Sequence, residues 1–168
     1  MGCVMKVSFV GHRKIKETQK LQNSLYNTIL SLINTGATTF LFGSRSEFDD
    51  LAWEIVTEIK KQYPFIQRVY IRSSFQYIDK PYEEYLLKFY EKTYYPSTIK
   101  NAGKYSYVER NMFMIDNSDY CIFYYDSNYI PLLQSSKQNS PHEAKRSGTK
   151  LAFEYARKKH KNIINLFE

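Results

Sequence analysis

Residues 39–54, TFLFGSRSEFDDLAWE, decide the fold of this chain. The apolar run at 40–42 is short enough for a buried strand, and Gly43-Ser44 is a turn signal. Apolar residues then recur at helical spacing, at Phe48, Leu51, Ala52, Ile55 and Ile59. A strand, a glycine turn and a helix together present backbone N–H groups and the positive end of a helix dipole to an anion. Asp49 and Asp50 stand at the helix start, where carboxylates cap free N–H groups or hold a ribose hydroxyl.

The composition predicts one domain with a substantial core. The chain has 168 residues, of which 43% are hydrophobic, with 16 Tyr and 11 Phe. These values exclude global disorder, and no apolar stretch approaches the ~20 residues of a membrane span. The net charge of +7 favours anionic partners. We expect a cytoplasmic protein.

Cysteine and histidine usage argues against a disulfide framework and a metal site. Cys3 and Cys121 both lie in apolar runs, which predicts two small buried side chains rather than nucleophiles. The three histidines are far apart, and none has metal-ligand spacing to a cysteine or a carboxylate. We therefore expect no metal.

Strand and helix patterns alternate along the rest of the chain. Further strands are predicted at 5–10, 67–71, 120–125 and 162–167, and further helices at 18–34, 81–91, 107–117 and from Ser147-Gly148-Thr149 onward. In the helix at 107–117, Val108, Met112 and Ile115 are expected to face inward. Residues 93–96 fit either a short strand or an irregular connection. The polar segment 126–146 fits either a lid, closing with Lys137, His142 or Lys145, or a disordered insertion.

Apolar strands that alternate with helices predict a mainly parallel sheet with helices on both faces. In such a sheet, ligands bind beyond the carboxyl ends of the strands. Three strand ends or helix starts carry small or basic residues suited to an anion, namely Gly11-His12-Arg13, Gly43-Ser44-Arg45 and Ser147-Gly148-Thr149. We expect these three loops to converge on one phosphate-binding crevice. Neither GxGxxG nor GxxxxGK[ST] is present, so no dinucleotide cofactor or P-loop is predicted.

Four motifs in order along the chain resemble a known superfamily. They are FVGHRK, FGSRSEFDDLAWE, YVERNMFMIDNSDYCIFYYD and SGTKLAFEYARKKHKNIINL. They are similar to those of the stand-alone bacterial members of the SLOG superfamily, which is related to the Lonely Guy phosphoribohydrolases and to the DNA-processing protein A family. The resemblance covers nearly the whole chain. It implies a single Rossmann-like domain over residues 1–168, with 126–146 as a loop insertion.

The resemblance also implies a nucleotide-type ligand. The ligand would lie over the glycine turns, with Asp49 at the acidic position of a Gly-to-Asp motif. Glu109-Arg110 matches the pair that precedes a Lonely Guy active site, where the arginine helps cleave an N-glycosidic bond, and Asn111 follows that pair. The family's carboxylate after its Gly-Thr turn is missing, because Leu151 and Ala152 occupy those positions.

Three functions follow from these features. The first is binding of a nucleotide or nucleotide-derived ligand, in which Arg13, Arg45 and Arg110 would neutralise phosphate. The alternative is hydrolysis of a nucleoside monophosphate, in which Arg110 and Glu109 would be catalytic and Glu143 or Glu154 would replace the missing acid. The third, which we disfavour because basic and aromatic residues form no stripe, is binding of single-stranded nucleic acid. A homodimer is plausible in this superfamily.

Overall fold

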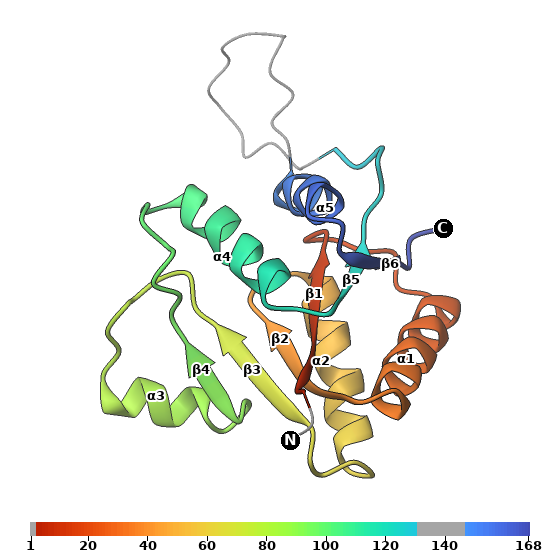
Figure 1. Cartoon of the computed structure of the whole chain (residues 1–168), viewed down its shortest axis with the longest axis horizontal. Helices are drawn as coiled ribbons and strands as arrows, with labels where there is room; N and C mark the ends of the chain where they lie inside the picture. The colour runs from red at the N-terminus through yellow and green to blue at the C-terminus, as the bar shows by residue number, and fades with distance from the viewer. Residues whose placement is uncertain (1–2, 131–146) are drawn as a thin grey trace, which may run out of the picture.

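The computed structural model describes residues 3–130 and 147–168, and within them strands alternate with helices (Figure 1). The strands are β1 (Met5–Gly11), β2 (Ala37–Phe42), β3 (Gln67–Ile71), β4 (Lys92–Tyr94), β5 (Tyr120–Tyr124) and β6 (Asn162–Asn165). The helices are α1 (Gln19–Asn34), α2 (Glu47–Lys60), α3 (Lys80–Leu86), α4 (Lys104–Asp116) and α5 (Gly148–Lys158).

The strands form one parallel sheet in the order β4-β3-β2-β1-β5-β6. From β1 the chain builds outward through β2, β3 and β4, and it then returns to place β5 on the other side of β1. The strand order therefore reverses between β1 and β5. In a sheet of this kind, such a reversal opens a crevice beyond the carboxyl ends of the two strands. The fold is the expected Rossmann-like α/β domain.

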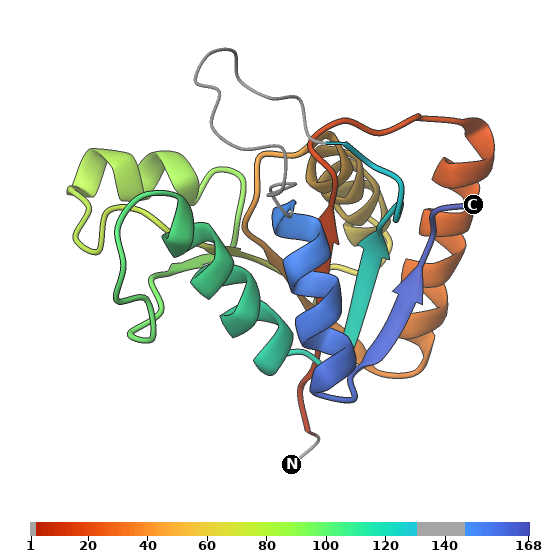
Figure 2. The same cartoon turned by 90° about the horizontal axis from the view of Figure 1, so that it is seen from above.

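Both faces of the sheet carry helices, as predicted (Figure 2). Alternate residues of a strand point to opposite faces. On β5, Ile122 packs in the cluster that includes α1 and α2, whereas Cys121 and Phe123 pack in the cluster that includes α5. Met114 of α4 packs with Leu41 of β2 on the α5 side.

Most helices begin at a residue whose side chain accepts a hydrogen bond from the first turn. Thr18 caps α1, Ser46 caps α2, Asp79 caps α3 and Ser147 caps α5. Such caps satisfy backbone donors that have no partner inside the helix, and this fixes where each helix starts. The cap at Ser46 places the start of α2 next to the Gly43-Ser44 turn.

The chain between β3 and β4 differs from prediction. The helix expected at 81–91 is α3, which ends at Leu86, because the following aromatic residues leave the helix to pack on the sheet and on α2. The backbone oxygen of Phe89 accepts a hydrogen bond from Trp53 Nε1 at 3.2 Å, and Tyr90 stacks on Tyr70 with ring centroids 5.1 Å apart. Of the ambiguous segment 93–96, Thr93 and Tyr94 belong to the short strand β4.

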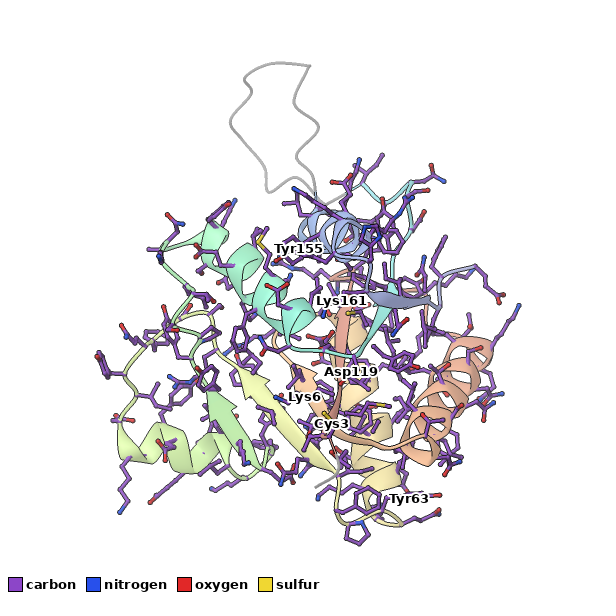
Figure 3. The ribbon with its side chains drawn as sticks, in the orientation of Figure 1. Cys3, Lys6, Tyr63, Asp119, Tyr155 and Lys161 are labelled. Carbon is purple, nitrogen blue, oxygen red and sulfur yellow. The ribbon has the colours of Figure 1, made fainter. Side chains whose placement is uncertain are left out.

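Two predictions of burial were wrong. Val108 and Met112 are only half-buried, whereas the buried face of α4 includes Arg110, Asn111 and Met114 together with the expected Ile115. Cys3 is exposed because β1 begins only at Met5, while Cys121 is buried as predicted. Figure 3 shows Cys3 and Lys6 at the amino end of β1.

Candidate functional site

The carboxyl ends of β1 and β2 are joined through the start of α2. The Arg13 backbone oxygen accepts a hydrogen bond from the Glu47 N–H at 2.9 Å. The Glu47 carboxylate in turn accepts from the Ile15 N–H and from Lys14 Nζ, each at 2.9 Å. These bonds hold the loop after β1 against the loop after β2, so two of the three predicted anion loops lie together.

The Gly43-Ser44 turn is fastened to the buried carboxylate of Asp49. Asp49 Oδ2 accepts hydrogen bonds from the Ser44 N–H, at 2.7 Å, and from the Ser44 hydroxyl. Asp49 does not cap the helix, because Ser46 Oγ accepts from the Asp49 N–H at 3.0 Å. The Asp49 side chain is only 3% exposed, and its Oδ1 has no hydrogen-bond partner within the described residues.

Burial sets the protonation of Asp49. Desolvation raises its pKa to about 6, although hydrogen bonds from Ser44 and the charge of Arg110 oppose the rise. A carboxyl group in this range gains or loses a proton close to neutral pH. One of its oxygens is free to receive a donor, so the group can accept a ligand hydroxyl.

Arg110 approaches the same turn from α4. A Cβ on Gly43 would lie 2.8 Å from both Cδ and Nε of Arg110 and 2.7 Å from Sδ of Met114, so a side chain at this position would force these two buried side chains to move. The guanidinium is buried, with Nη1 donating to Ser73 Oγ at 3.2 Å and Nη2 donating to Asn111 Oδ1 at 3.2 Å. Its hydrogen-bond partners are neutral, and its charge interacts with the carboxylate of Asp49.

His12 lies at the point where the strand order reverses. Its Nε2 accepts a hydrogen bond from the Asp126 N–H at 2.8 Å, which places the proton of the neutral ring on Nδ1. Burial lowers the pKa of His12 below its ordinary value, so the ring is neutral at physiological pH. Tyr129 stacks on the ring with centroids 3.8 Å apart. Nδ1 has no partner among the described residues, although the side chain is 1% exposed.

The third predicted loop starts α5. Figures 1 and 2 both place the amino end of α5 beside the carboxyl end of β1. Ser147 Oγ accepts from the Lys150 N–H at 3.0 Å, Thr149 is buried, and Gly148 is exposed with no atom within 4 Å of an added Cβ. The start of this helix therefore lies at the same rim as the other two loops.

Comparison with known proteins identifies the family and the fold. The YpsA family model, described as the YspA SLOG family, matches residues 9–154. The chain belongs to this SLOG family. A solved structure of DNA processing protein A from Helicobacter pylori, described as binding single-stranded DNA, is similar with a TM-score of 0.56 and 18% identity. The alignment covers 95% of this chain and 63% of that one, and at this identity it shows the shared fold alone. No curated protein matches.

Within this SLOG chain, the two members of the expected catalytic pair have different partners. The Glu109 carboxylate accepts hydrogen bonds from the backbone N–H groups of Lys100 and Asn101, each at 3.1 Å. Desolvation would raise the pKa of Glu109, but these bonds and one from the Asn101 side chain outweigh it and lower the pKa. Glu109 thus anchors the segment before α4, while Arg110 lies inside the molecule.

The remaining predicted residues of this SLOG site are surface groups or lie outside the described residues. Arg13 and Arg45 are exposed. Lys137, His142, Glu143 and Lys145 all fall within residues 131–146, so most of the predicted 126–146 loop, with its lid and its substitute acid, lies outside the described part. Glu154, the other substitute acid, is on α5.

Two residues that contact the candidate site, Ser73 and Tyr129, were not predicted from the sequence. Ser73 follows β3, and only its position after a strand could have indicated a role. Tyr129 follows β5 in the segment that was assigned to a polar loop. The only indication in the sequence was an aromatic residue four positions after Tyr125. No group of three potential metal ligands occurs within residues 3–130 and 147–168, and no helix there is long and apolar enough to cross a membrane.

Proposed function

We propose that the chain binds a nucleotide or a nucleotide-derived phosphorylated ligand at the carboxyl edge of β1, β2 and β5. The observation that carries the proposal is a pair of buried polar atoms without partners in the described structure, Asp49 Oδ1 and His12 Nδ1. Such atoms cost free energy unless a ligand or water satisfies them. Asp49 Oδ1 would accept from a ribose hydroxyl, and His12 Nδ1–H would donate to an oxygen of the ligand.

The charges at this edge suit a phosphate. Arg110 is buried beside the Gly43-Ser44 turn, and the exposed Arg13 and Arg45 follow the two glycines at the mouth. The amino ends of α2 and α5 add partial positive charge. In this arrangement Arg110 would meet the phosphate inside the crevice, and the two surface arginines would draw it in.

The test is calorimetry and thermal denaturation against nucleoside mono- and diphosphates, ADP-ribose and NAD, preceded by native mass spectrometry for a copurified nucleotide. Binding should raise the melting temperature, because a ligand that binds only the folded state stabilises it. His12→Gln, which keeps an acceptor for the Asp126 N–H, and Arg110→Gln should each weaken binding. Arg157→Gln, on the exposed end of α5, is the matched control. If no nucleotide binds at millimolar concentration, the proposal fails.

Hydrolysis of an N-glycosidic bond is the second candidate, because the pKa of Asp49 is about 6 and suits a general acid or base. Asp49 would then act in place of the carboxylate that the family carries after its Gly-Thr turn. Release of free base from nucleoside monophosphates, lost in Asp49→Asn, would support it. Tight binding without base release would reject it.

Single-stranded DNA belongs in the same panel, because DNA processing protein A is described as binding it. This relative weighs against our expectation that nucleic acid is not a partner. An oligonucleotide that competes with a mononucleotide, and does so at 200 mM salt, would mean that the crevice accepts a strand. Binding that is lost with modest salt would be non-specific attraction to a basic protein.

A further inference from the structure

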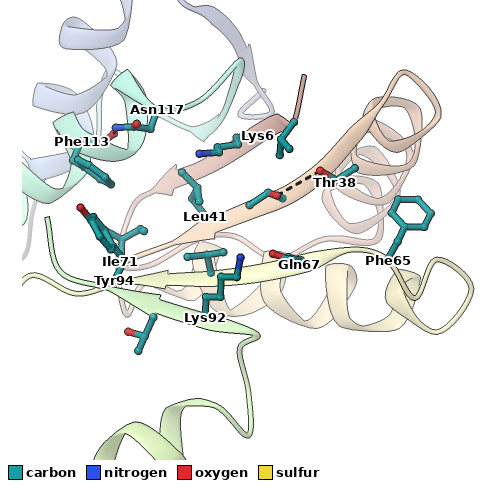
Figure 4. A pocket seen from close by; sticks show the side chains of 14 residues that line it. Lys6, Thr38, Leu41, Phe65, Gln67, Ile71, Lys92, Tyr94, Phe113 and Asn117 are labelled. Carbon is teal, nitrogen blue, oxygen red and sulfur yellow. Dashed lines mark hydrogen bonds between the residues drawn. The ribbon is translucent and has the colours of Figure 1, made fainter. Parts of the chain in front are cut away.

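A concave surface lined by other residues than those of the proposed nucleotide site lies along β1, β2, β3 and β4. It is an open groove of about 760 Å³ on the face that carries α4 (Figure 4). We call it the amino-end groove, because Lys6, Thr38, Gln67 and Lys92 line it from the amino halves of four strands. Its floor runs along the strands as far as Ile71 and Tyr94, the last residues of β3 and β4. None of its lining residues belongs to the proposed nucleotide site, so the two surfaces are distinct.

The floor of this amino-end groove is apolar. Leu41, Val69 and Ile71 point up from the sheet, and Phe113 of α4 stacks on Tyr94 of β4 with ring centroids 5.5 Å apart. Three large apolar side chains at the rim are strongly exposed, with relative exposures of 56% for Val4, 56% for Phe65 and 47% for Tyr94. Apolar side chains gathered in one exposed groove are typical of a binding surface.

The charged side chains that line the groove are all positive. Among its fourteen lining residues, all in the described part of the chain, are two lysines and no aspartate or glutamate. Figure 4 shows Lys6 and Lys92 entering the groove from its two sides.

The two acids next to these lysines do not bond to their ammonium groups. The Asp119 carboxylate accepts from the backbone N–H of Lys6, and Glu91 is paired with Arg68 and Lys60. Neither Lys6 Nζ nor Lys92 Nζ has an ion pair or a hydrogen bond within the described residues.

The positive charge of the groove indicates which kind of molecule can bind there. Two copies that paired these grooves about a twofold axis would bring four lysines together with no lining acid between them, which is unfavourable. An occupant with an apolar body and a negative group would instead cover the floor and pair with the lysines. The volume falls in the range of small-molecule sites, about 300–1,000 Å³.

We propose that the amino-end groove binds a small anionic amphiphile, with one carboxylate, sulfonate or phosphate on an aliphatic or aromatic body. The body lies on Leu41, Val69 and Phe113. The acid group is held between Lys6 and Lys92. This site is independent of the proposed nucleotide site.

The test uses the full chain and the fluorescent anion 1-anilinonaphthalene-8-sulfonate, with dodecanoate and dodecanol as competitors. The dye should bind the native protein at one site, dodecanoate should displace it, and uncharged dodecanol at equal concentration should not. In the double variant K6E/K92E, dye affinity should fall about tenfold or more, because two attractive contacts become repulsive. The same variant should gain affinity for the cation dodecyltrimethylammonium, which a merely structural effect would not produce.

The matched control is K88E/K158E, which makes the same change of charge at two exposed lysines outside the groove. It should bind the dye as the wild type does, and all variants should unfold at similar temperatures. Equal loss in both double variants would mean general charge attraction and overturn the proposal, as would unchanged dye binding in K6E/K92E. A wild-type dimer that dissociates in K6E/K92E would assign the groove to a second copy and overturn it too. Nucleotide affinity should be unchanged in K6E/K92E. Failure of the groove proposal can therefore be distinguished from failure of the nucleotide proposal.

Discussion

Asp49 and Arg110 are two buried, oppositely charged side chains that interact beside the Gly43-Ser44 turn. The carboxylate comes from the start of α2 and the guanidinium from the middle of α4, on the other face of the sheet. Arg110 lowers the pKa of Asp49, but burial outweighs it and the net shift is upward. The pair therefore costs stability when both groups are charged, and such a cost is typical of a site that awaits a ligand.

The raised pKa of Asp49 gives a pH dependence of stability with a definite sign. The pKa is about 6 in the folded chain against 3.8 for an unperturbed aspartate. Between these values the folded state binds more protons than the unfolded state, so the contribution of Asp49 to stability falls as pH rises from about 4 to above 6. A shift of about two units corresponds to at most about 3 kcal/mol.

Asp49→Asn should remove this dependence. The unfolding free energy of the variant minus that of the wild type should increase as pH rises from 4 to 7, in urea titrations at each pH. Asp50→Asn is the control, since Asp50 is the exposed neighbour on the same helix. If the unfolding free energies of the wild type and of Asp49→Asn change with pH in parallel, the pKa of Asp49 is not raised by burial.

Gly11 should tolerate no side chain. An added Cβ would lie 2.4 Å from ring atoms of Phe48, which is fully buried and cannot move aside. Gly11→Ala should therefore destabilise the fold by about 1–3 kcal/mol in chemical denaturation. Gly148→Ala is the matched control, because nothing lies within 4 Å of an added Cβ. It should change stability by no more than about 1 kcal/mol, in the stabilising direction, because alanine favours a helix. If the two alanine variants change stability equally, residue 11 does not lie as close to Phe48 as the structure shows.

The sequence predicted those parts of the fold that depend on local periodicity. Residues 39–60 follow the expected strand, turn and helix because most apolar positions there are buried, although Trp53 and Ile55 are only half-buried. The helix α4 was predicted, but its buried face was not. That face includes Ser106, Arg110 and Asn111, so its pattern of apolar residues does not mark the inward side.

The positions of the glycine loops were predicted for a similar reason. Strand ends of a parallel sheet share one edge, so the convergence of Gly11 and Gly43 followed from the order of elements. The contact of Arg110 with the turn beside Gly43 could not be predicted, since it depends on how far α4 lies from the sheet. The stacking of Tyr129 on His12 depends on the path of a loop, which no periodic pattern fixes.

The two cysteines should differ sharply in reactivity. Cys3 is exposed before β1, whereas Cys121 is inside β5, where burial raises the pKa of its thiol and so reduces the reactive thiolate. A thiol reagent such as dithionitrobenzoate should therefore modify one thiol quickly in the native protein and the second only on unfolding. Cys3→Ser should abolish the fast phase, and Cys121→Ser should leave it intact. If both thiols react quickly in the native protein, Cys121 is not buried.

Tyr129 should control the protonation of His12. The stacked tyrosine ring contributes to the burial that lowers the pKa of His12. In Tyr129→Ala water reaches the imidazole, so its pKa should rise toward the ordinary value of 6.5, as followed by NMR titration of the ring protons. Tyr129→Phe keeps the ring and should leave the pKa low, and His12→Gln identifies the His12 signal. If the pKa of His12 is the same in Tyr129→Ala and in the wild type, the stacked arrangement does not persist in solution.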